Sequence, residues 1–288
     1  LPPVVAFVST YLPKRCGLAT FASDLRASLN DPKHVVVAVD DQERDFPEEV
    51  KLVIQKHDRT SYLNAARTVN ENWDAVSLQH EYGIFGGPDG EYVIDFLDHL
   101  EVPCITTLHT VLKRPSEGQL RVLRAIAARS EKIMVMSDRA SEILAEVYDI
   151  SDDKIEVIYH GVPTSDGVKK APQMTAYGDD PKLLTFGLLS PGKGIEVAID
   201  AVAEIAKSHP NVRYFVLGQT HPDLVAREGE SYRDSLVARA RELGVEENVV
   251  FVNEYTTLEK LCTYLAAADL YVTPYRSKDQ IVSGTLSY

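Results

Sequence analysis

The feature that most constrains the fold of this chain is a regular alternation of short apolar runs with segments of helical periodicity. This alternation is typical of parallel sheets covered by helices, whose ligands bind beyond the carboxyl ends of the strands. We therefore predict α/β architecture with doubly wound, Rossmann-like parallel sheets. Strands are predicted at Val4–Val8, Val35–Val39, Leu52–Ile54, Ala75–Leu78, Cys104–Leu108, Lys132–Met136, Glu156–Tyr159, Leu183–Phe186, Arg213–Leu217, Val249–Val252 and Leu270–Val272. Helices are predicted at Leu18–Leu29, Ser61–Glu71, Tyr92–His99, Glu117–Ala128, Arg139–Val147, Ile195–Lys207, Tyr232–Leu243 and Leu258–Ala267.

The pattern is interrupted once, by a stretch rich in Pro, Gly and Asp that has no periodicity. This predicts an N-terminal domain over residues 1–163, an interdomain linker over 164–181 and a C-terminal domain over 182–288. Two such domains imply a cleft between them. Too few residues follow the last predicted strand to finish a doubly wound domain, so we expect the second domain to be incomplete.

Charge and composition exclude several classes of protein. The net charge is −13 and no long Lys/Arg run is present, which argues against a nucleic-acid partner. The three cysteines are dispersed, which favours a reduced, cytoplasmic setting. The N-terminus lacks the basic region of a signal peptide, and no apolar run approaches the ~18 residues of a membrane span.

The run from Thr185 to Gly194 joins a predicted strand to a predicted helix through a glycine-bearing turn. This order gathers free backbone N–H groups and the positive end of a helix dipole at one point. Lys193 adds a full positive charge, while Gly192 and Gly194 let the backbone approach a ligand closely. The segment predicts a phosphate or diphosphate site; the alternative is a helix that merely begins with Gly-Lys-Gly and a solvated lysine.

Reactive residues also follow strands of the first domain. The turn after the first strand carries Lys14, Arg15 and Gly17, and could hold a phosphate or be an ordinary turn. His80 and His109 each lie at a strand's carboxyl end, where hydrogen bonds to sugar hydroxyls or proton transfer would be placed; structural histidines are the alternative.

Several motifs are absent. His80 and Glu81 are adjacent, so they point to opposite sides of an extended segment, and no paired Asp motif is present. No metal site is therefore predicted. The Gly-X-Ser-X-Gly and Gly-X-Gly-X-X-Gly motifs are also missing, which argues against a hydrolase and a dehydrogenase.

Taken together, these segments resemble the large retaining group of GT-B glycosyltransferases, the "glycosyl transferase group 1" family. The resemblance covers essentially the whole chain, in order. It rests on Gly17 before a helix, His109 in Thr-Thr-Leu-His-Thr, Ile155–Pro163, Gly187–Gly194 and Ala268–Pro274.

The resemblance implies that the first domain binds the acceptor and the second binds a nucleoside-diphosphate sugar, the donor. Lys193 would hold the diphosphate, Gly17 would approach it, and His109 would lie beside the transferred sugar. No metal or cofactor would be needed, because the lysine and the helix N-terminus neutralise the leaving diphosphate. Further candidates are Gly192, Gly194, Gln280, Ser283, Gly284 and Thr285 for the donor, His80, Glu81 and Arg15 for the acceptor or sugar, and Asn253 and Tyr255 for the base or ribose. Gln219–Pro222 could line the cleft or form a turn.

The chain also departs from the family pattern. Leu188 stands where an arginine is usual, and the paired acids align with Gln280 and Tyr288; Asp279 replaces the first acid if the alignment slips by one residue. Cys16 replaces a loop glycine, and His160 stands where Asn is common. A divergent member with an altered donor is therefore expected.

The leading hypothesis is a metal-independent retaining glycosyltransferase that moves a hexose from a nucleoside-diphosphate sugar to a sugar or polyol hydroxyl. A catalytically inactive sugar- or nucleotide-binding protein on the same fold is the first alternative. A sugar phosphorylase or nucleotide-sugar epimerase is the second, because fold resemblance does not separate these activities. The sequence does not fix the oligomeric state.

Overall fold

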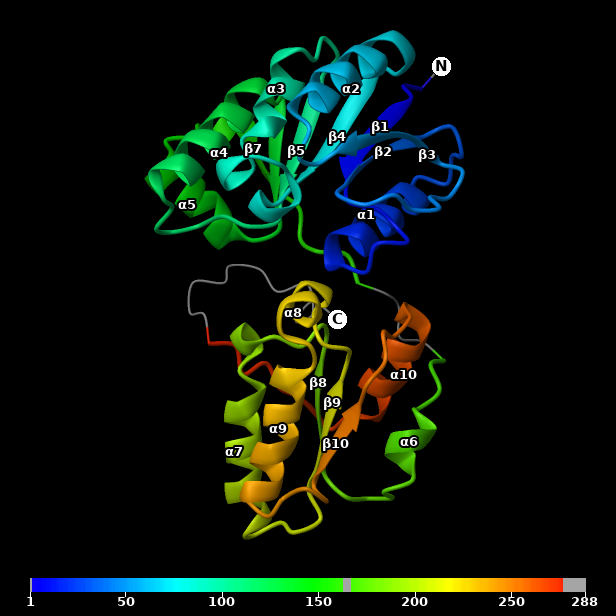
Figure 1. Cartoon of the computed structure of the whole chain (residues 1–288), viewed down its shortest axis with the longest axis vertical. Helices are drawn as coiled ribbons and strands as arrows, with labels where there is room; N and C mark the ends of the chain where they lie inside the picture. Colours follow the sequence, from blue (N-terminus) through cyan, green and yellow to red (C-terminus); the bar gives the residue numbers. More distant parts are fainter. Residues whose placement is uncertain (1, 163–166, 277–288) are drawn as a thin grey trace. The chain divides into compact units, whose positions relative to one another are not determined.

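The structure is a computed structural model that describes residues 2–162 and 167–276 of the 288-residue chain. The chain divides into two compact units, the first ending at His160 and the second beginning at Gly161. Each unit is built on one parallel sheet flanked by helices (Figure 1). The predicted α/β class with two parallel sheets is confirmed.

The first unit contains a seven-stranded sheet in the order β3-β2-β1-β4-β5-β6-β7. All neighbouring strands run parallel. The direction of winding reverses beside β1, which lies between β2 and β4, so a ligand site is expected at that point of the carboxyl edge. The strands are β1 (Val5–Ser9), β2 (Val35–Asp40), β3 (Val50–Gln55), β4 (Ala75–His80), β5 (Cys104–Leu108), β6 (Lys132–Val135) and β7 (Ile155–Val157).

Helices cover both faces of this sheet, because successive strand residues point to opposite sides. Ala6 and Val8 of β1 pack in a core with helices α2, α3 and α4, whereas Phe7 packs against Ala22 of α1. The helices are α1 (Gly17–Ser28), α2 (Arg59–Asn72), α3 (Tyr92–Asp98), α4 (Glu117–Arg129) and α5 (Asp138–Tyr148), with short 3₁₀ turns at η1 (Tyr82–Ile84), η2 (Pro88–Gly90) and η3 (Asp152–Lys154).

The second unit contains a four-stranded parallel sheet in the order β10-β9-β8-β11. Its winding reverses beside β8, between β9 and β11. Helices α7 and α9 pack on one face, α6 and α10 on the other. The elements are β8 (Lys182–Phe186), β9 (Arg213–Leu217), β10 (Val249–Val252), β11 (Leu270–Tyr271), α6 (Pro172–Thr175), η4 (Pro191–Lys193), α7 (Ile195–Ala206), α8 (Pro222–Glu228), α9 (Ser231–Glu242) and α10 (Leu258–Ala267).

The predicted elements recur within a few residues, and two helices were not predicted. Helix α8 begins at Pro222, and His221 is its N-cap residue. The His221 ring accepts a hydrogen bond from the Asp223 N–H. Helix α6 lies in the segment expected to be a linker. Ala171 and Met174 of that segment are buried in the core of the second unit, because a short helix can bury two apolar side chains without extended periodicity.

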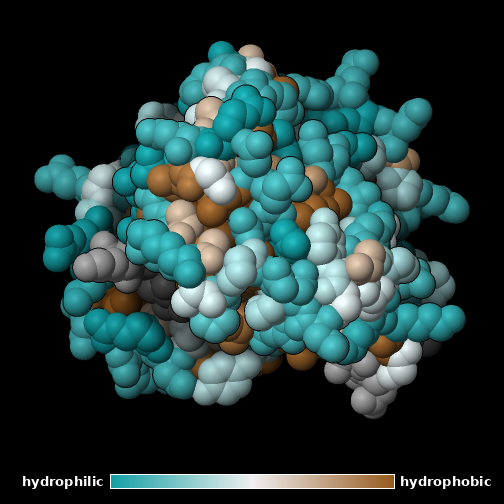
Figure 2. Space-filling view, turned by 90° about the horizontal axis from the view of Figure 1, so that it is seen from below, coloured by the Kyte–Doolittle hydropathy of each residue, from teal (hydrophilic) through white to brown (hydrophobic). Residues whose placement is uncertain are grey.

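One face of the surface is shown by residue hydropathy in Figure 2. In Figure 2 hydrophilic residues dominate the visible face, and hydrophobic ones form only small separate areas. Exposed apolar side chains scattered in this way are normal for a folded protein and need no partner.

Gly218, which follows β9, provides a test of the second unit's packing. Its φ angle is +146°, and a Cβ atom there would lie 2.0 Å from the carbonyl oxygen of Gly187. Gly218→Ala should lower the free energy of unfolding by at least about 1–3 kcal/mol, because both the backbone conformation and the close contact exclude a side chain. Urea denaturation followed by circular dichroism measures this.

Gly192→Ala is the matched control, because nothing lies within 4 Å of a Cβ atom built there. Equal stability of the two variants would contradict the role given to the Gly187–Gly218 contact.

Candidate functional site

The loop after β8 places Lys193 directly before helix α7. The Lys193 ammonium group donates a hydrogen bond to the Tyr275 hydroxyl at 2.9 Å and lies 4.3 Å from the centre of that ring. Tyr275 comes from the segment after β11, the strand beside β8. The loops after β8 and β11, which flank the reversal of winding, thus meet through Lys193 and Tyr275. Tyr275 holds the Lys193 ammonium group near the N-terminus of α7.

Gly194 connects this loop to the helix. Its φ angle is +64°, in the left-handed region, and a Cβ atom would lie 2.1 Å from the Pro274 carbonyl oxygen. Only glycine fits such a position without movement of the backbone. The predicted need for glycine here therefore has a structural cause, the close approach of the segment after β11.

The start of α7 is suited to an anion. Gly194, its N-cap residue, supplies no side-chain hydrogen bond to the helix, and Gly192 borders open space. The N–H of Arg276 donates to the Gly192 carbonyl at 3.2 Å, and its guanidinium lies 3.3 Å from the carboxylate of Glu196. Lys193 thus places a cation beside a helix N-terminus, where anions are stabilised, and Arg276 adds a second cation that is paired with Glu196.

Tyr275 and Arg276 were missed as site residues from the sequence. The only available signal was their position, immediately after the Ala268–Pro274 segment. Pairing of β8 with β11, which brings them to Lys193, is a tertiary contact between distant parts of the chain.

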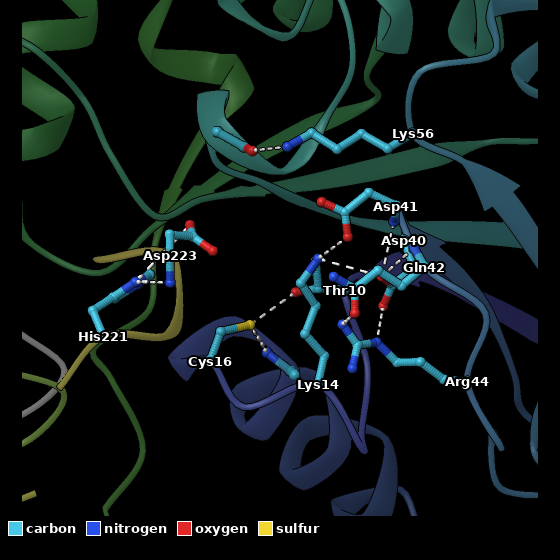
Figure 3. Close-up of polar contacts among 12 residues, drawn as sticks. Thr10, Lys14, Cys16, Asp40, Asp41, Gln42, Arg44, Lys56, His221 and Asp223 are labelled. Atoms are coloured by element: carbon cyan, nitrogen blue, oxygen red, sulfur yellow. Dashed lines mark hydrogen bonds and ion pairs between the residues drawn. The ribbon is translucent and has the colours of Figure 1, made fainter. Parts of the chain in front are cut away.

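In the first unit, Lys14 lies in the loop after β1 and points toward two carboxylates at the end of β2 (Figure 3). Its ammonium nitrogen lies 3.6 Å from Asp40 and 3.5 Å from Asp41. Asp40 is 1% exposed and also accepts a hydrogen bond from Arg44 at 2.8 Å. Lys14 therefore compensates buried negative charge, which does not favour its predicted place beside a phosphate. Arg15 is exposed.

The beginning of α1 is open at Gly17, where nothing lies within 4 Å of a Cβ atom. The preceding Cys16 caps the helix: its sulfur accepts a hydrogen bond from the Ala19 N–H at 3.4 Å and lies 3.3 Å from the Thr10 hydroxyl. Cys16 thus occupies a structural position, while Gly17 leaves space for a ligand.

His109 follows β5 and is partly exposed. Its Nε2 lies 3.0 Å from Oε1 of Gln79, and its ring makes an edge contact with Phe21 of α1, with ring centres 4.7 Å apart. Burial, helped by the nearby His160, lowers the pKa of His109 to about 4. The ring is therefore neutral at physiological pH.

His80 faces the other side of the same sheet. It pairs in register with Leu108, so His109 points to the opposite face. His80 is 0% exposed and lies between the rings of Tyr82 and Phe85, and burial lowers its pKa to about 3. The predicted contact between His80 and a sugar stays a prediction. The buried position of the His80 side chain in the core does not favour it.

The remaining predicted residues are distributed as follows. Glu81 accepts a hydrogen bond from the Thr110 hydroxyl, and burial raises its pKa. Asn253 and Tyr255 are exposed after β10. Within Gln219–Pro222, His221 caps α8, which supports the turn alternative. Gln280, Ser283, Gly284 and Thr285 lie outside the described residues, as does Tyr288.

Two further searches cover residues 2–162 and 167–276. Within them, no group of three or more His, Cys, Asp or Glu side chains could hold a metal ion. No helix in this part of the chain is long and apolar enough to cross a membrane.

The buried His80 makes a testable contribution to acid sensitivity. An unfolded histidine has a pKa of about 6.5, above the folded value, so the unfolded state binds more protons as the pH falls below 6.5. The free energy of unfolding should therefore fall between pH 7 and pH 5. His80→Phe should reduce this fall by the order of 2 kcal/mol.

Urea denaturation monitored by Trp73, the single tryptophan, which packs against the core of the first unit, measures this difference. His57→Gln is the control, because His57 is exposed in the folded state as well. An unchanged pH dependence in His80→Phe would contradict the assignment.

Comparisons with known proteins agree with this architecture. Residues 17–166 match the family model "Glycosyltransferase Family 4", and residues 169–280 match "Glycosyl transferases group 1". The chain is 27% identical over 226 residues to a D-inositol 3-phosphate glycosyltransferase of Segniliparus rotundus, covering 70% of this chain and 46% of that protein. It is 28% identical over 116 residues to a GDP-mannose-dependent alpha-(1-6)-phosphatidylinositol monomannoside mannosyltransferase of Mycolicibacterium smegmatis, covering 40% and 28%. The chain thus spans about half the length or less of these curated relatives.

Solved structures are similar in fold. A glycosyltransferase from Rickettsia africae superposes with a TM-score of 0.70 at 16% identity, over 97% of this chain and 75% of that one. Sucrose-phosphate synthase from Thermosynechococcus elongatus superposes with a TM-score of 0.72 at 17% sequence identity, over 96% of this chain and 76% of that one. With a family model matched over more than half of its length and two parallel sheets of the GT-B type, the chain belongs to glycosyltransferase family 4, its second unit matching the group 1 glycosyl transferases.

Proposed function

We propose that the protein is a retaining glycosyltransferase that moves a hexose from a nucleoside-diphosphate sugar to a sugar or polyol hydroxyl. The observation that carries the proposal is the placement of Lys193, paired with Tyr275, at the open N-terminus of α7. This position lies at the carboxyl edge of a parallel sheet, beside the reversal of its winding, where such sheets bind ligands.

The second unit would bind the donor. Its diphosphate would lie against the first N–H groups of α7, with the Lys193 ammonium as the main counter-charge. Arg276 would add a second positive charge, which offsets the absence of an arginine at Leu188. Preorganised donors of this kind stabilise the negative charge that develops on a leaving diphosphate, so the proposal requires no metal ion or cofactor.

The first unit would bind the acceptor and place His109 beside the transferred sugar. A neutral imidazole can accept a hydrogen bond from a sugar hydroxyl and can steady positive charge at the anomeric carbon. The names of the relatives support a sugar or polyol acceptor, since D-inositol 3-phosphate glycosyltransferase and sucrose-phosphate synthase both name hydroxyl-rich products or substrates.

The direct test is turnover of nucleotide sugars by the full-length protein, screened first by thermal shift, because ligand binding raises stability by mass action. Transfer to a sugar or polyol with the donor's anomeric configuration kept supports the proposal. Binding of a nucleotide sugar without hydrolysis or transfer would instead indicate an inactive binding protein. Dependence on inorganic phosphate would indicate a phosphorylase.

Lys193→Ala should weaken donor binding by at least about tenfold, because a charge-assisted contact to a phosphate contributes about 1.5–3 kcal/mol. The melting temperature should change little, since the side chain lies in a loop rather than in a core. Isothermal titration with a nucleoside diphosphate measures the affinity. Lys207→Ala is the matched control, because Lys207 lies at the C-terminal end of the same helix and pairs with Glu204 on the surface. Equal affinity of both variants would refute the diphosphate site.

His109→Ala should lower kcat by about 10²-fold or more, the scale of a positioned catalytic group, while donor affinity stays nearly constant. Steady-state kinetics and titration with the donor separate the two effects. A variant that keeps its turnover, or whose loss is explained by unfolding in circular dichroism, would remove His109 from the catalytic residues.

A further inference from the structure

A chain of hydrogen bonds fixes the side chain of Gln79, the residue at the end of β4 that precedes His80. Gln79 is 0% exposed. Its amide nitrogen donates to the Ser77 hydroxyl at 3.1 Å, and its carbonyl oxygen lies 3.0 Å from Nε2 of His109. Ser77, Gln79 and His109 share one face of the sheet, because β4 and β5 pair in parallel with Gln79 opposite Thr107.

This orientation determines where the proton of the neutral imidazole resides. A carbonyl oxygen only accepts, so Nε2 of His109 must carry the hydrogen and donate it to Gln79. The other ring nitrogen, Nδ1, then holds a lone pair. Among the described residues 2–162 and 167–276, no group forms a hydrogen bond with Nδ1.

We propose that Gln79 is a positioning residue that holds His109 as a hydrogen-bond acceptor, with the proton on Nε2 and the lone pair of Nδ1 directed to a ligand hydroxyl. The inference rests on the proposed function for the identity of that ligand, the transferred sugar. It adds a requirement: the sugar must donate a hydroxyl hydrogen to this ring. A sugar that offers only an acceptor at this position would be bound poorly.

The surroundings keep the ring in this neutral state. Phe21 packs against it at an interplanar angle of 86°. The titratable groups on neighbouring elements are Asp24 of α1, His80 and Glu81 at the end of β4, and His160 after β7. Of these, His160 acts on His109 in the direction that disfavours a second positive charge.

The first experiment replaces Gln79 with methionine, which is of similar size and cannot accept the hydrogen bond. In the native protein, ¹⁵N spectra of labelled histidine should show His109 protonated at Nε2 and bare at Nδ1. Gln79→Met should lose this preference and lower kcat by about 10- to 100-fold, the usual effect of removing an orienting partner, with donor KM nearly constant. Gln55→Met is the control, because Gln55 is exposed at the end of β3.

The second experiment uses Gln79→Glu, which keeps an acceptor oxygen and adds negative charge. A carboxylate beside Nε2 favours the imidazolium form, so the pKa of His109 should rise and the acidic limb of the rate profile should move to higher pH. Above that pKa the neutral ring and its Nε2 proton return, and turnover should recover relative to Gln79→Met. A purely structural role for Gln79 predicts no such pH-dependent rescue.

The inference is overturned if His109 carries its proton on Nδ1 in the native protein. It is also overturned if Gln79→Met retains both the native ¹⁵N pattern and native kcat. The spectra need no substrate, so they decide the inference about Gln79 even if Gln79→Glu does not fold. Failure of every nucleotide sugar as a donor would instead refute the proposed function and leave the spectra to be judged on their own.

Discussion

Parallel pairing is the constraint on which the rest of this structure depends. In a parallel sheet every strand ends at the same edge. Loops that are distant in the sequence therefore become neighbours when the strands that precede them pair. In the first unit this brings Gln79 of β4 to His109 after β5. In the second it brings the segment after β11 to the loop after β8. The pairs Gln79–His109 and Lys193–Tyr275 thus owe their contacts to strand order.

Local sequence signals predicted the elements well, and tertiary contacts explain what they missed. The hydrophobic periods gave the strands and the long helices to within a few residues. Helix α8 went unpredicted because its start depends on the His221 cap, and α6 because only Ala171 and Met174 bury against a core. Among candidate site residues, the motif around Lys193 predicted the loop that carries this lysine. It did not predict that Tyr275 would be the hydrogen-bond partner of Lys193. Histidines at strand ends were visible, whereas the register that buries His80 and leaves His109 accessible was not.

The two units solve the electrostatic problem of an acidic protein in different ways. In the second unit, cations stand at a helix terminus where an anion is favoured despite the net charge of −13. In the first unit, the Lys14 ammonium group compensates the buried Asp40 carboxylate, and burial keeps the ring of His109 neutral.

The contact between Gly187 and Gly218 also limits how this part of the protein can evolve. The two loops after β8 and β9 approach closely through backbone atoms of Gly187 and Gly218, and a parallel bridge between Leu189 and Thr220 continues the contact. A side chain has no room at Gly218, and it would be strained at Gly187, whose φ angle is +118°. Substitutions that retune ligand choice without disturbing this backbone contact are therefore expected at neighbouring positions of each loop, such as Leu188 and Gln219, and not at the glycine pair.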